Sequence, residues 1–302
     1  MSASLEIIAN DNNLCGEGPI WSDTQKRLYW NDMNASLVFQ YDHGTGESKT
    51  ISTGLMAAGM TFNNDGSILF AGFSGIHLWH GQGEFKTLVT HHGGEELWFN
   101  DVLADSKGRL YAGTIYWGAD GSMTKPGRLY RIDPDLSVHV MDEGFGMANG
   151  LGLSLDGSTL YFADSTARRV YAYQVDPATG NLSNRRDFVR VPDEEGMPDG
   201  VTVDVDGFVW NAQWYGGQVV RYDPDGKVER RVKLPVTQIA SLIFGGPDLN
   251  ELYITTAGEN WPSPFMPPGY DPTKVACGGA LYRVKLDVQG RLDYQTRFAW
   301  AK

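Results

Sequence analysis

Four side chains with oxygen donors occupy equivalent places in the chain, each ahead of a recurring turn. They are Glu17, Asn100, Asn149 and Asp199. Two carboxylates bring negative charge and two amides bring neutral carbonyl oxygens, which is the ligand chemistry that Ca²⁺, Mg²⁺ and Mn²⁺ prefer. A cation held in this way polarises a carbonyl oxygen and lowers the pKa of a bound water. The sequence therefore predicts a site for one divalent cation, with Ca²⁺ preferred and Mg²⁺, Mn²⁺, Zn²⁺ or Fe²⁺ as alternatives.

Each of these residues taken alone is also explained as a turn or strand-start residue whose side chain bonds to the backbone. An alignment on the turn glycines Gly66, Gly108, Gly157 and Gly207, and on Leu28 and Leu252, separates the two interpretations. The aligned positions are Glu17, Ala58, Asn100, Asn149, Asp199 and Ser241. Four oxygen donors in register on different strands favour a shared ligand at one level of a channel.

The turns belong to a segment that recurs six times. Its matched apolar positions are Leu28, Leu69, Leu110, Leu160, Val209 and Leu252, separated by 41, 41, 50, 49 and 43 residues. This spacing is the period of a four-stranded propeller blade. A further strand is predicted after each copy, at Leu37 to Asp42, Gly75 to His80, Gly127 to Asp133, Arg168 to Asp176, Gly217 to Asp223 and Gly279 to Asp287. The prediction is an all-β, six-bladed β-propeller with four antiparallel strands per blade and the metal site in its central channel.

Length and composition agree with one propeller domain over residues 1–302, rich in turns with 37 glycines and 14 prolines. The net charge of −12 argues against a nucleic-acid partner, because a phosphate backbone requires a basic patch. Met1 to Asn10 lacks the pattern of a signal peptide, and no apolar run is long enough to span a membrane. We expect a cytoplasmic protein, a monomer or weak homo-oligomer, that acts on a small molecule. Cys15 and Cys277 are expected as free thiols, with a disulfide between neighbouring blades as the alternative.

Six short motifs resemble the SMP-30/gluconolactonase family, also called regucalcin-like, and more distantly the diisopropyl-fluorophosphatase propellers. They are Gly16-Glu17-Gly18-Pro19-Ile20-Trp21, Asn100-Asp101, Asn149-Gly150-Leu151, Pro198-Asp199-Gly200, Trp210-Asn211-Ala212 and Phe244-Gly245-Gly246-Pro247-Asp248. The resemblance covers essentially the whole chain. It implies a metal-dependent hydrolase that opens lactones, with the ion bound by Glu17, Asn149 and Asp199. It also implies that Asn100 reaches substrate or water, or ligates the metal as in the phosphatase-like members.

Hydrolysis of a lactone needs a base to take a proton from the attacking water. Asp199 can serve as metal ligand and general base together, and the neighbouring Asp101 is a weaker candidate. No competing nucleophile motif is present, because Gly-x-Ser-x-Gly is absent and neither cysteine has a nearby histidine in the sequence.

One position departs from the family pattern. Sugar-lactone members often have an arginine two residues before the Asn of the Asn-Asp pair, and this chain has Trp98 there. An indole offers one donor and a large apolar face in place of five guanidinium donors. Trp98 is expected either to stack on substrate or to be ordinary blade packing. A lactonase of broader type is therefore a better prediction than a gluconolactonase.

Specificity is expected from loops at one mouth of the channel. The candidate loops are Met56 to Met60, Glu95 to Phe99, Tyr116 to Lys125, Gln213 to Gly217 and Trp261 to Tyr270. Tyr116 and Trp214 are expected in an aromatic wall, and the proline-rich Trp261 to Tyr270 is either a lid or a plain surface loop. Two other functions remain as alternatives to lactonase. One is a phosphotriesterase or organophosphate-fluoride hydrolase, and the other is a non-catalytic calcium-binding regulatory propeller.

Overall fold

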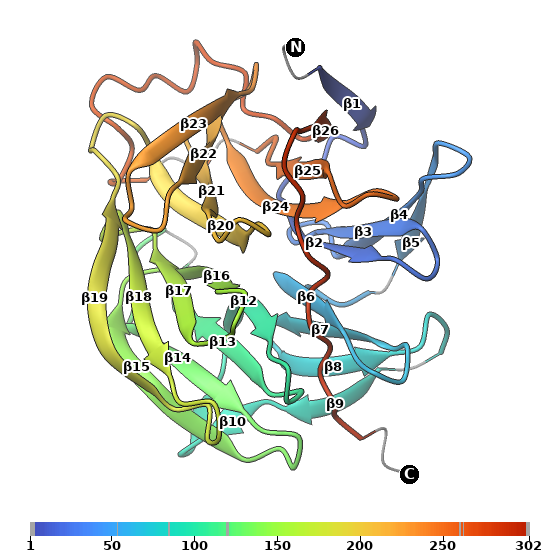
Figure 1. Ribbon diagram of the computed structural model, residues 1–302, viewed down its shortest axis with the longest axis vertical. Coiled ribbons are helices and arrows are strands. Elements are labelled where there is room, and N and C mark those ends of the chain that lie inside the picture. Colours follow the sequence, from blue (N-terminus) through green and yellow to red (C-terminus); the bar gives the residue numbers. More distant parts are fainter. Residues whose placement is uncertain are drawn as a thin grey trace.

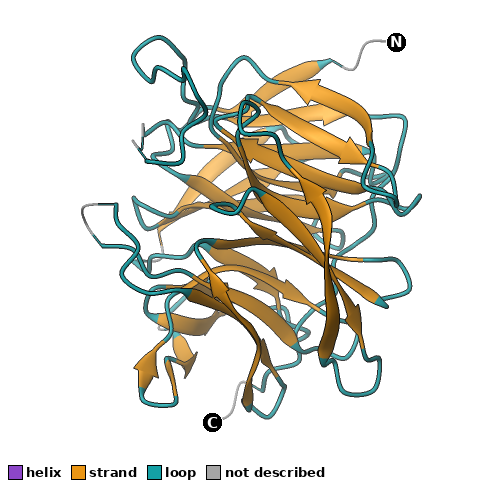
Figure 2. Cartoon of the chain, turned by 90° about the vertical axis from the view of Figure 1, so that its left-hand side faces the viewer, coloured by secondary structure: helices purple, strands orange, loops and turns teal. Residues whose placement is uncertain are grey.

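The strands of the computed structural model form six four-stranded antiparallel sheets arranged in a ring (Figure 1). The structure describes residues 4–52, 54–83, 85–118, 121–259, 261 and 263–299. Within these ranges every regular element is a β-strand, as Figure 2 shows from the side. The prediction of a six-bladed β-propeller is confirmed. No helix in the described ranges has the length and hydropathy needed to cross a bilayer.

Each blade begins with the strand nearest the channel. Blade 1 contains β2 (Gly16–Ser22), β3 (Arg27–Asp32), β4 (Leu37–Asp42) and β5 (Glu47–Ser52), and blade 2 contains β6 (Gly59–Phe62), β7 (Ile68–Gly72), β8 (Gly75–Trp79) and β9 (Lys86–Val89). Blade 3 contains β12 (Phe99–Ala104), β13 (Leu110–Thr114), β14 (Gly127–Ile132) and β15 (Val138–Phe145), and blade 4 contains β16 (Ala148–Leu153), β17 (Thr159–Asp164), β18 (Arg169–Val175) and β19 (Leu182–Arg190). Blade 5 contains β20 (Met197–Val203), β21 (Val209–Trp214), β22 (Gln218–Tyr222) and β23 (Val228–Lys233). A small separate hairpin joins β10 (His91–His92) to β11 (Glu95–Glu96).

Blade 6 joins the two ends of the chain. It contains β24 (Ile239–Gly245), β25 (Glu251–Thr256) and β26 (Leu281–Lys285), and its outer strand is β1 (Leu5–Ala9). Leu5 pairs with Val284 and Ala9 with Leu281. Main-chain hydrogen bonds between β1 and β26 therefore close the ring, a pairing that the repeat pattern did not predict. The strands predicted to follow each copy of the repeated segment match β4, β8, β14, β18, β22 and β26 to within two residues at each end.

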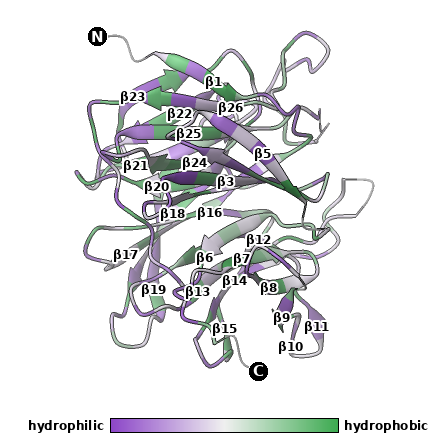
Figure 3. Ribbon diagram, turned by 90° about the vertical axis from the view of Figure 1, so that its right-hand side faces the viewer, coloured by the Kyte–Doolittle hydropathy of each residue, from purple (hydrophilic) through white to green (hydrophobic). Residues whose placement is uncertain are grey.

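The core lies between the faces of neighbouring blades. Trp30, Trp210 and Tyr253 are completely buried, and the rings of Phe145 and Phe162 meet edge to face with centroids 4.8 Å apart. Large aromatic side chains fill such interfaces because each removes a large apolar area from water. The outermost strands carry both hydrophilic and hydrophobic residues, as Figure 3 shows for β1.

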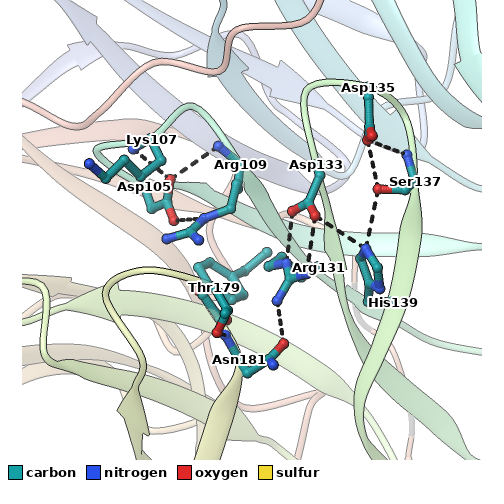
Figure 4. Close-up of polar contacts among 12 residues, drawn as sticks. Asp105, Lys107, Arg109, Arg131, Asp133, Asp135, Ser137, His139, Thr179 and Asn181 are labelled. Carbon is teal, nitrogen blue, oxygen red and sulfur yellow. Dashed lines mark hydrogen bonds and ion pairs between the residues drawn. The ribbon is translucent and has the colours of Figure 1, made fainter.

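Polar contacts also join blade 3 to blade 4 (Figure 4). Arg109 is buried and pairs with Asp105, with Nε 2.6 Å from Oδ2. Arg131 pairs with Asp133 at 2.8 Å and donates to Asn181 Oδ1 in the next blade. A buried guanidinium without such partners would destabilise the fold strongly. These residues position the blades and lie away from the channel residues predicted for chemistry.

The C-terminal segment, residues 287–299, crosses one face of the ring, where Figure 1 draws it in red. Gly290 N donates to Leu249 O at 2.8 Å in blade 6, and Thr296 N donates to Phe62 O at 3.0 Å in blade 2. Arg291 Nη2 donates to Leu153 O at 3.1 Å in blade 4. The buried Phe298 ends this crossing, with its amide 2.9 Å from Asn63 Oδ1. We call this segment the strap and the face that it crosses the rear face.

Candidate functional site

The predicted channel residues lie where the inner strands are irregular. The pairing of inner strand with second strand shifts register between Glu17 and Ile20, Phe99 and Val102, Ala148 and Leu151, Pro198 and Val201, and Ile239 and Leu242. A β-bulge at such a place bends the strand and re-aims a side chain. Five blades therefore carry the same distortion at the level of the predicted ligands. Blade 2, with Ala58 at this level, pairs without a shift.

Glycines beside the predicted ligands let the inner strands approach one another. A Cβ atom on Gly150 would lie 2.3 Å from Asp199 O, and one on Gly200 would lie 2.7 Å from the Cα of Ser241. Both distances are shorter than real Cβ contacts allow. The glycine in each of the Asn149-Gly150 and Asp199-Gly200 pairs therefore allows the inner strands of blades 4, 5 and 6 to lie close together around the axis.

One cavity collects all four predicted oxygen donors. Glu17, Asn100, Asn149 and Asp199 line it together, each from a different blade. We call this space, of about 570 Å³ including its open part, the front cavity. Its remaining wall is mostly apolar and includes Met33, Ile115, Trp117, Met147, Met197, Trp214 and Trp261. The space suits a small ligand whose surface is largely buried on binding.

Hydrogen bonds fix how the amides face this cavity. Asn149 Nδ2 donates to Ser165 Oγ at 3.1 Å, and that hydroxyl donates to Pro198 O at 2.7 Å. Asn100 Nδ2 donates to Ala148 O at 3.0 Å. With each amino group attached to the protein, the carbonyl oxygen remains as the free acceptor of each side chain. Ser165, which the sequence analysis did not single out, thus orients Asn149.

The carboxylates carry the strongest electrostatic perturbation of the site. Burial raises the pKa of Glu17 to about 8, and the charge of Asp101 adds to the shift. Burial also raises the pKa of Asp199 well above its usual range, with the charge of Glu17 as the second cause. Two carboxylates close together in a weakly solvated cavity disfavour each other's ionised forms, and a nearby cation reverses this effect.

The donor set fits a hard divalent cation. Asp199 Oδ1 is buried and has no hydrogen-bond partner in the structure. A carboxylate oxygen left in this state is costly unless a positive charge compensates it. In the described part of the chain no three His, Cys, Asp or Glu side chains cluster together. The set therefore consists of two carboxylates and amide oxygens, a combination that suits Ca²⁺ or Mg²⁺ better than a soft metal.

Asp101 lies toward a second space, on the rear side of the ligand level. We call this space the rear chamber. It is lined by Asp101, Ser241, Arg291, Asp293 and other residues of the six inner strands. Burial raises the pKa of Asp101 to about 6, and Asp293 on the strap contributes to the shift. The strap residues Arg291 and Asp293 were not singled out from the sequence, because no repeat includes them.

The predicted substrate residues fall into two groups. Trp214 lines the front cavity, whereas Trp98 and Tyr116 are not among its described lining residues. The Trp98 ring stacks on the Phe73 ring with centroids 5.4 Å apart. The centroids of the Trp98 and Tyr116 rings are 5.9 Å apart. The hydroxyl of Tyr116 donates to Glu96 O at 3.0 Å. Trp98 and Tyr116 therefore form an aromatic rim beside the cavity, and their contact with substrate stays a prediction.

Parts of the other predicted loops do reach the cavity. Trp261 and Ser263 line it from the loop after β25, and Trp117 lines it from the loop after β13. Residues 119, 120 and 262 of these predicted loops lie outside the described residues. The methionines Met33, Met147 and Met197 were missed, since a single methionine at or beside the end of a strand has no distinctive spacing. Cys15 and Cys277 are free thiols, as expected.

Comparison with known proteins identifies the family of the chain. Residues 15–258 match the model of the SMP-30/Gluconolactonase/LRE-like region. The chain belongs to the SMP-30/gluconolactonase family. Among its family relatives is the pentonolactonase XacC of Haloferax volcanii, 38% identical over 284 residues that cover 93% of this chain and 94% of the relative. Another is a 6-deoxy-6-sulfogluconolactonase of Pseudomonas putida, 32% identical over 86% of this chain and 90% of the relative.

A solved structure shares the same family fold. A luciferin-regenerating enzyme superposes with a TM-score of 0.87 at 26% identity, covering 98% of this chain and all of the other. The resemblance inferred from the ordered sequence motifs is therefore confirmed.

Proposed function

We propose that this protein is a divalent-metal-dependent lactonase that hydrolyses a sugar lactone or related cyclic ester to the hydroxy acid. The observation that carries the proposal is the front cavity, where oxygen-bearing side chains from four blades meet and the amino group of each amide is bonded to the protein. Relatives named for the hydrolysis of pentonolactones and of a sulfogluconolactone support the reaction class.

Glu17, Asn149 and Asp199 would hold the ion, and Asn100 would either complete the ligand set or bind the substrate. When bound, a divalent cation would draw electron density from the lactone carbonyl and favour the oxyanion that forms there. The unpartnered Oδ1 of Asp199 is the atom that most directly supports this assignment.

Asp199 would also move the proton. A carboxylate oxygen of Asp199 accepts a proton as the water oxygen bonds to the lactone carbonyl carbon. The bond between that carbon and the ring oxygen then breaks, and the proton is returned to the departing alkoxide oxygen, so that a hydroxy acid leaves. Asn100, whose amino group is fixed on Ala148 O, would orient the substrate carbonyl or the water. Asp101 remains the second candidate for the base.

The direct test removes and restores metal. The protein is treated with a chelator and assayed by acid release on sugar and aliphatic γ-lactones, before and after addition of Ca²⁺, Mg²⁺, Mn²⁺, Zn²⁺ or Fe²⁺. We expect loss of hydrolysis on chelation and recovery with one or more ions. Full activity in the chelated protein would contradict the metal requirement, and no activity with any lactone and ion would contradict the reaction.

The apolar wall of the front cavity favours one second candidate. Phosphotriesters and organophosphate fluorides are less polar than aldonolactones, and Asn100 stands where it could ligate a metal directly. Adding a neutral phosphotriester to the same panel distinguishes the two, because a phosphotriesterase would hydrolyse it faster than any lactone. Metal binding without turnover of either class would instead favour a non-catalytic calcium-binding propeller.

A further inference from the structure

One stretch of the loop between β25 and β26 covers the front cavity. Trp261 and Ser263 line the cavity, and Phe265 follows directly behind them. The indole of Trp117 in blade 3 lies 6.1 Å from both the Trp261 and the Phe265 rings, centroid to centroid. We call Trp261, Ser263 and Phe265 the roof. It extends from blade 6 over the channel to blade 3.

Two side chains from other blades hold the roof by its backbone. Arg168, in the turn before β18, donates from Nη2 to Phe265 O at 2.7 Å and from Nη1 to Gly196 O. The buried Tyr215, after β21, donates its hydroxyl to Trp261 O. Because both bonds end on carbonyl oxygens, they fix the course of the roof whatever side chains it carries. The roof is thus attached to blades 4 and 5 as well as to its own blade.

A further aromatic contact anchors the end of the same loop. The ring of Tyr270 packs on Tyr215 with centroids 4.8 Å apart, and its hydroxyl lies 2.8 Å from Thr237 Oγ1. A loop attached at both its start and its end behaves as a wall of fixed position. A substrate must therefore fit beneath Trp261 rather than displace it.

The cavity beneath the roof offers nothing to bind an anionic substituent. Its charged lining residues are Glu17 and Asp199, and the described lining contains no lysine, arginine or histidine. A divalent cation would neutralise the charge of these two carboxylates, and the site would then have no net positive charge. The guanidinium of Arg168 is directed to carbonyl oxygens and is not among the lining groups.

Three donor groups that line the cavity are already engaged with the protein. The amino groups of Asn100 and Asn149 bond to Ala148 O and Ser165 Oγ, and Trp117 Nε1 donates to Gly146 O at 3.1 Å. A polyol placed against Met33, Met147 and Met197 would lose hydrogen bonds to water without replacing them. An apolar substituent in the same place would gain from burial.

We propose that the roof, positioned by Arg168 and Tyr215, selects small uncharged lactones with few hydroxyl groups. This inference rests on the proposed lactonase function and narrows its substrate class. Trp261 is the specificity-determining residue, because it lines the cavity, and Arg168 is a positioning residue that acts through the roof backbone.

The experiment compares three γ-lactones of similar ring size, bearing a methyl group, several hydroxyl groups or a carboxylate. The wild-type protein is expected to show the highest kcat/KM for the methyl lactone and the lowest for the anionic one. Trp261→Ala opens space under the roof while keeping the carbonyl that Tyr215 binds. It should therefore narrow the preference between methyl and polyhydroxylated lactones by about tenfold, the scale of a hydrophobic-pocket contact.

Arg168 is tested with a matched neighbour. Arg168→Met should raise KM for the methyl lactone more than it lowers kcat, and Arg168→Lys should restore part of the loss. Arg169→Met is the control, because Arg169 pairs with the exposed Asp187 on the outer edge and makes no contact with the roof. A role in folding alone would instead lower the active fraction and leave KM and substrate ranking unchanged.

Binding is also measured without turnover. Methyl- and carboxylate-bearing γ-lactams are titrated against the tryptophan fluorescence of the chelated protein, where tighter binding of the methyl lactam is expected and Trp261→Ala should reduce it. An unaltered substrate ranking in Trp261→Ala, or a wild-type preference for the anionic lactone, would overturn the roof proposal. Absence of turnover with every lactone would overturn the lactonase function, and the lactam titration would still test the roof.

Discussion

The two ends of the channel are built in contrasting ways. The front cavity is formed by the first residues of the inner strands and by long loops, and its wall is mostly apolar around two carboxylates. The rear chamber is formed by the middle of the same strands and is covered by the strap with Arg291 and Asp293. The inner strands thus present one end with the candidate site and another end that the strap covers. We expect function to be concentrated at the end with the long loops, and stability at the end that the strap fixes.

The means of closure differ as well. The roof over the front cavity is fastened by side chains that reach backbone carbonyls. The strap is fastened mainly by backbone hydrogen bonds to four blades, and the Arg291 side chain and the buried Phe298 add to them. A closure made by a few side chains is altered by single substitutions, and one made by the backbone resists them. Substitutions at the front are therefore expected to change catalysis, and those at the rear to change stability.

The largest expected effect is at the ligand level. Glu17→Gln, Asn149→Ala and Asp199→Asn should each lose most hydrolysis, and Asp199→Asn should lower kcat by roughly 10²–10⁴-fold, as removal of a general base does. Steady-state kinetics, with metal content and thermal unfolding measured alongside, provides the check. If Asp199→Asn kept its metal and a near-native rate, the base would be sought at Asp101 instead.

The rear end should respond in the opposite way. Phe298→Ala removes a buried ring and is expected to reduce the free energy of unfolding by about 3–5 kcal/mol. The folded fraction should keep kcat/KM near the wild-type value, because Phe298 is not among the described lining residues of the front cavity. Val228→Ala, at an exposed site on β23, is a control for the unfolding measurement. A large loss of kcat/KM in folded Phe298→Ala would break the contrast between the two ends.

A pH series in the chelated protein should sharpen the contrast. Glu17 has a folded pKa of about 8 against an ordinary value of 4.5, so the folded state holds its proton more tightly than the unfolded state. Its contribution to stability is complete below pH 4.5 and is lost as the pH rises through about 8. The increase in Tm on adding Ca²⁺ should therefore grow over this interval. Glu17→Gln should make the Tm of the chelated protein depend less on pH between 4.5 and about 8. A wild-type Tm that rises with pH over this interval would contradict the prediction.

The smallest effect is expected at the rim. Trp98 stacks on Phe73, outside the described lining of the front cavity, so Trp98→Ala should weaken binding by about 0.5–1.5 kcal/mol, the value of an aromatic pair. Trp98→Arg should shift relative kcat/KM toward polyhydroxylated lactones. An unchanged ranking in both variants would make Trp98 a packing residue and leave specificity to the roof.

Much of the site was predictable because it repeats. Glu17, Asn100, Asn149 and Asp199 are related by the blade period, so an alignment on turn glycines locates them without knowledge of any long-range contact. The bulges that aim them recur at the same level in five blades. The pairing of β1 with β26 and the path of the strap occur once each, and a single contact between distant segments has no period from which to infer it.

The direction of loop side chains was the other feature that could not be predicted from the sequence. Tyr116 and Trp117 are adjacent aromatic residues in one loop, yet Trp117 lines the front cavity and the hydroxyl of Tyr116 bonds to Glu96 O. Loop residues have no strict alternation of faces, so composition alone does not tell which ring contacts the ligand. Arg168 shows the same limit, because its role depends on a carbonyl 97 positions later in the chain.

The pairing of β1 with β26 has a consequence for the order of events during synthesis. β1 leaves the ribosome before blades 1–5, whereas its partner β26 follows them, so β1 remains unpaired while these five blades form. Closing a loop of about 280 residues costs about 5 kcal/mol in chain entropy, and no contact recovers it until β26 arrives. Formation of blade 6 is therefore expected to be the late step of folding, and a nascent or truncated chain would expose strand edges on which aggregation can begin.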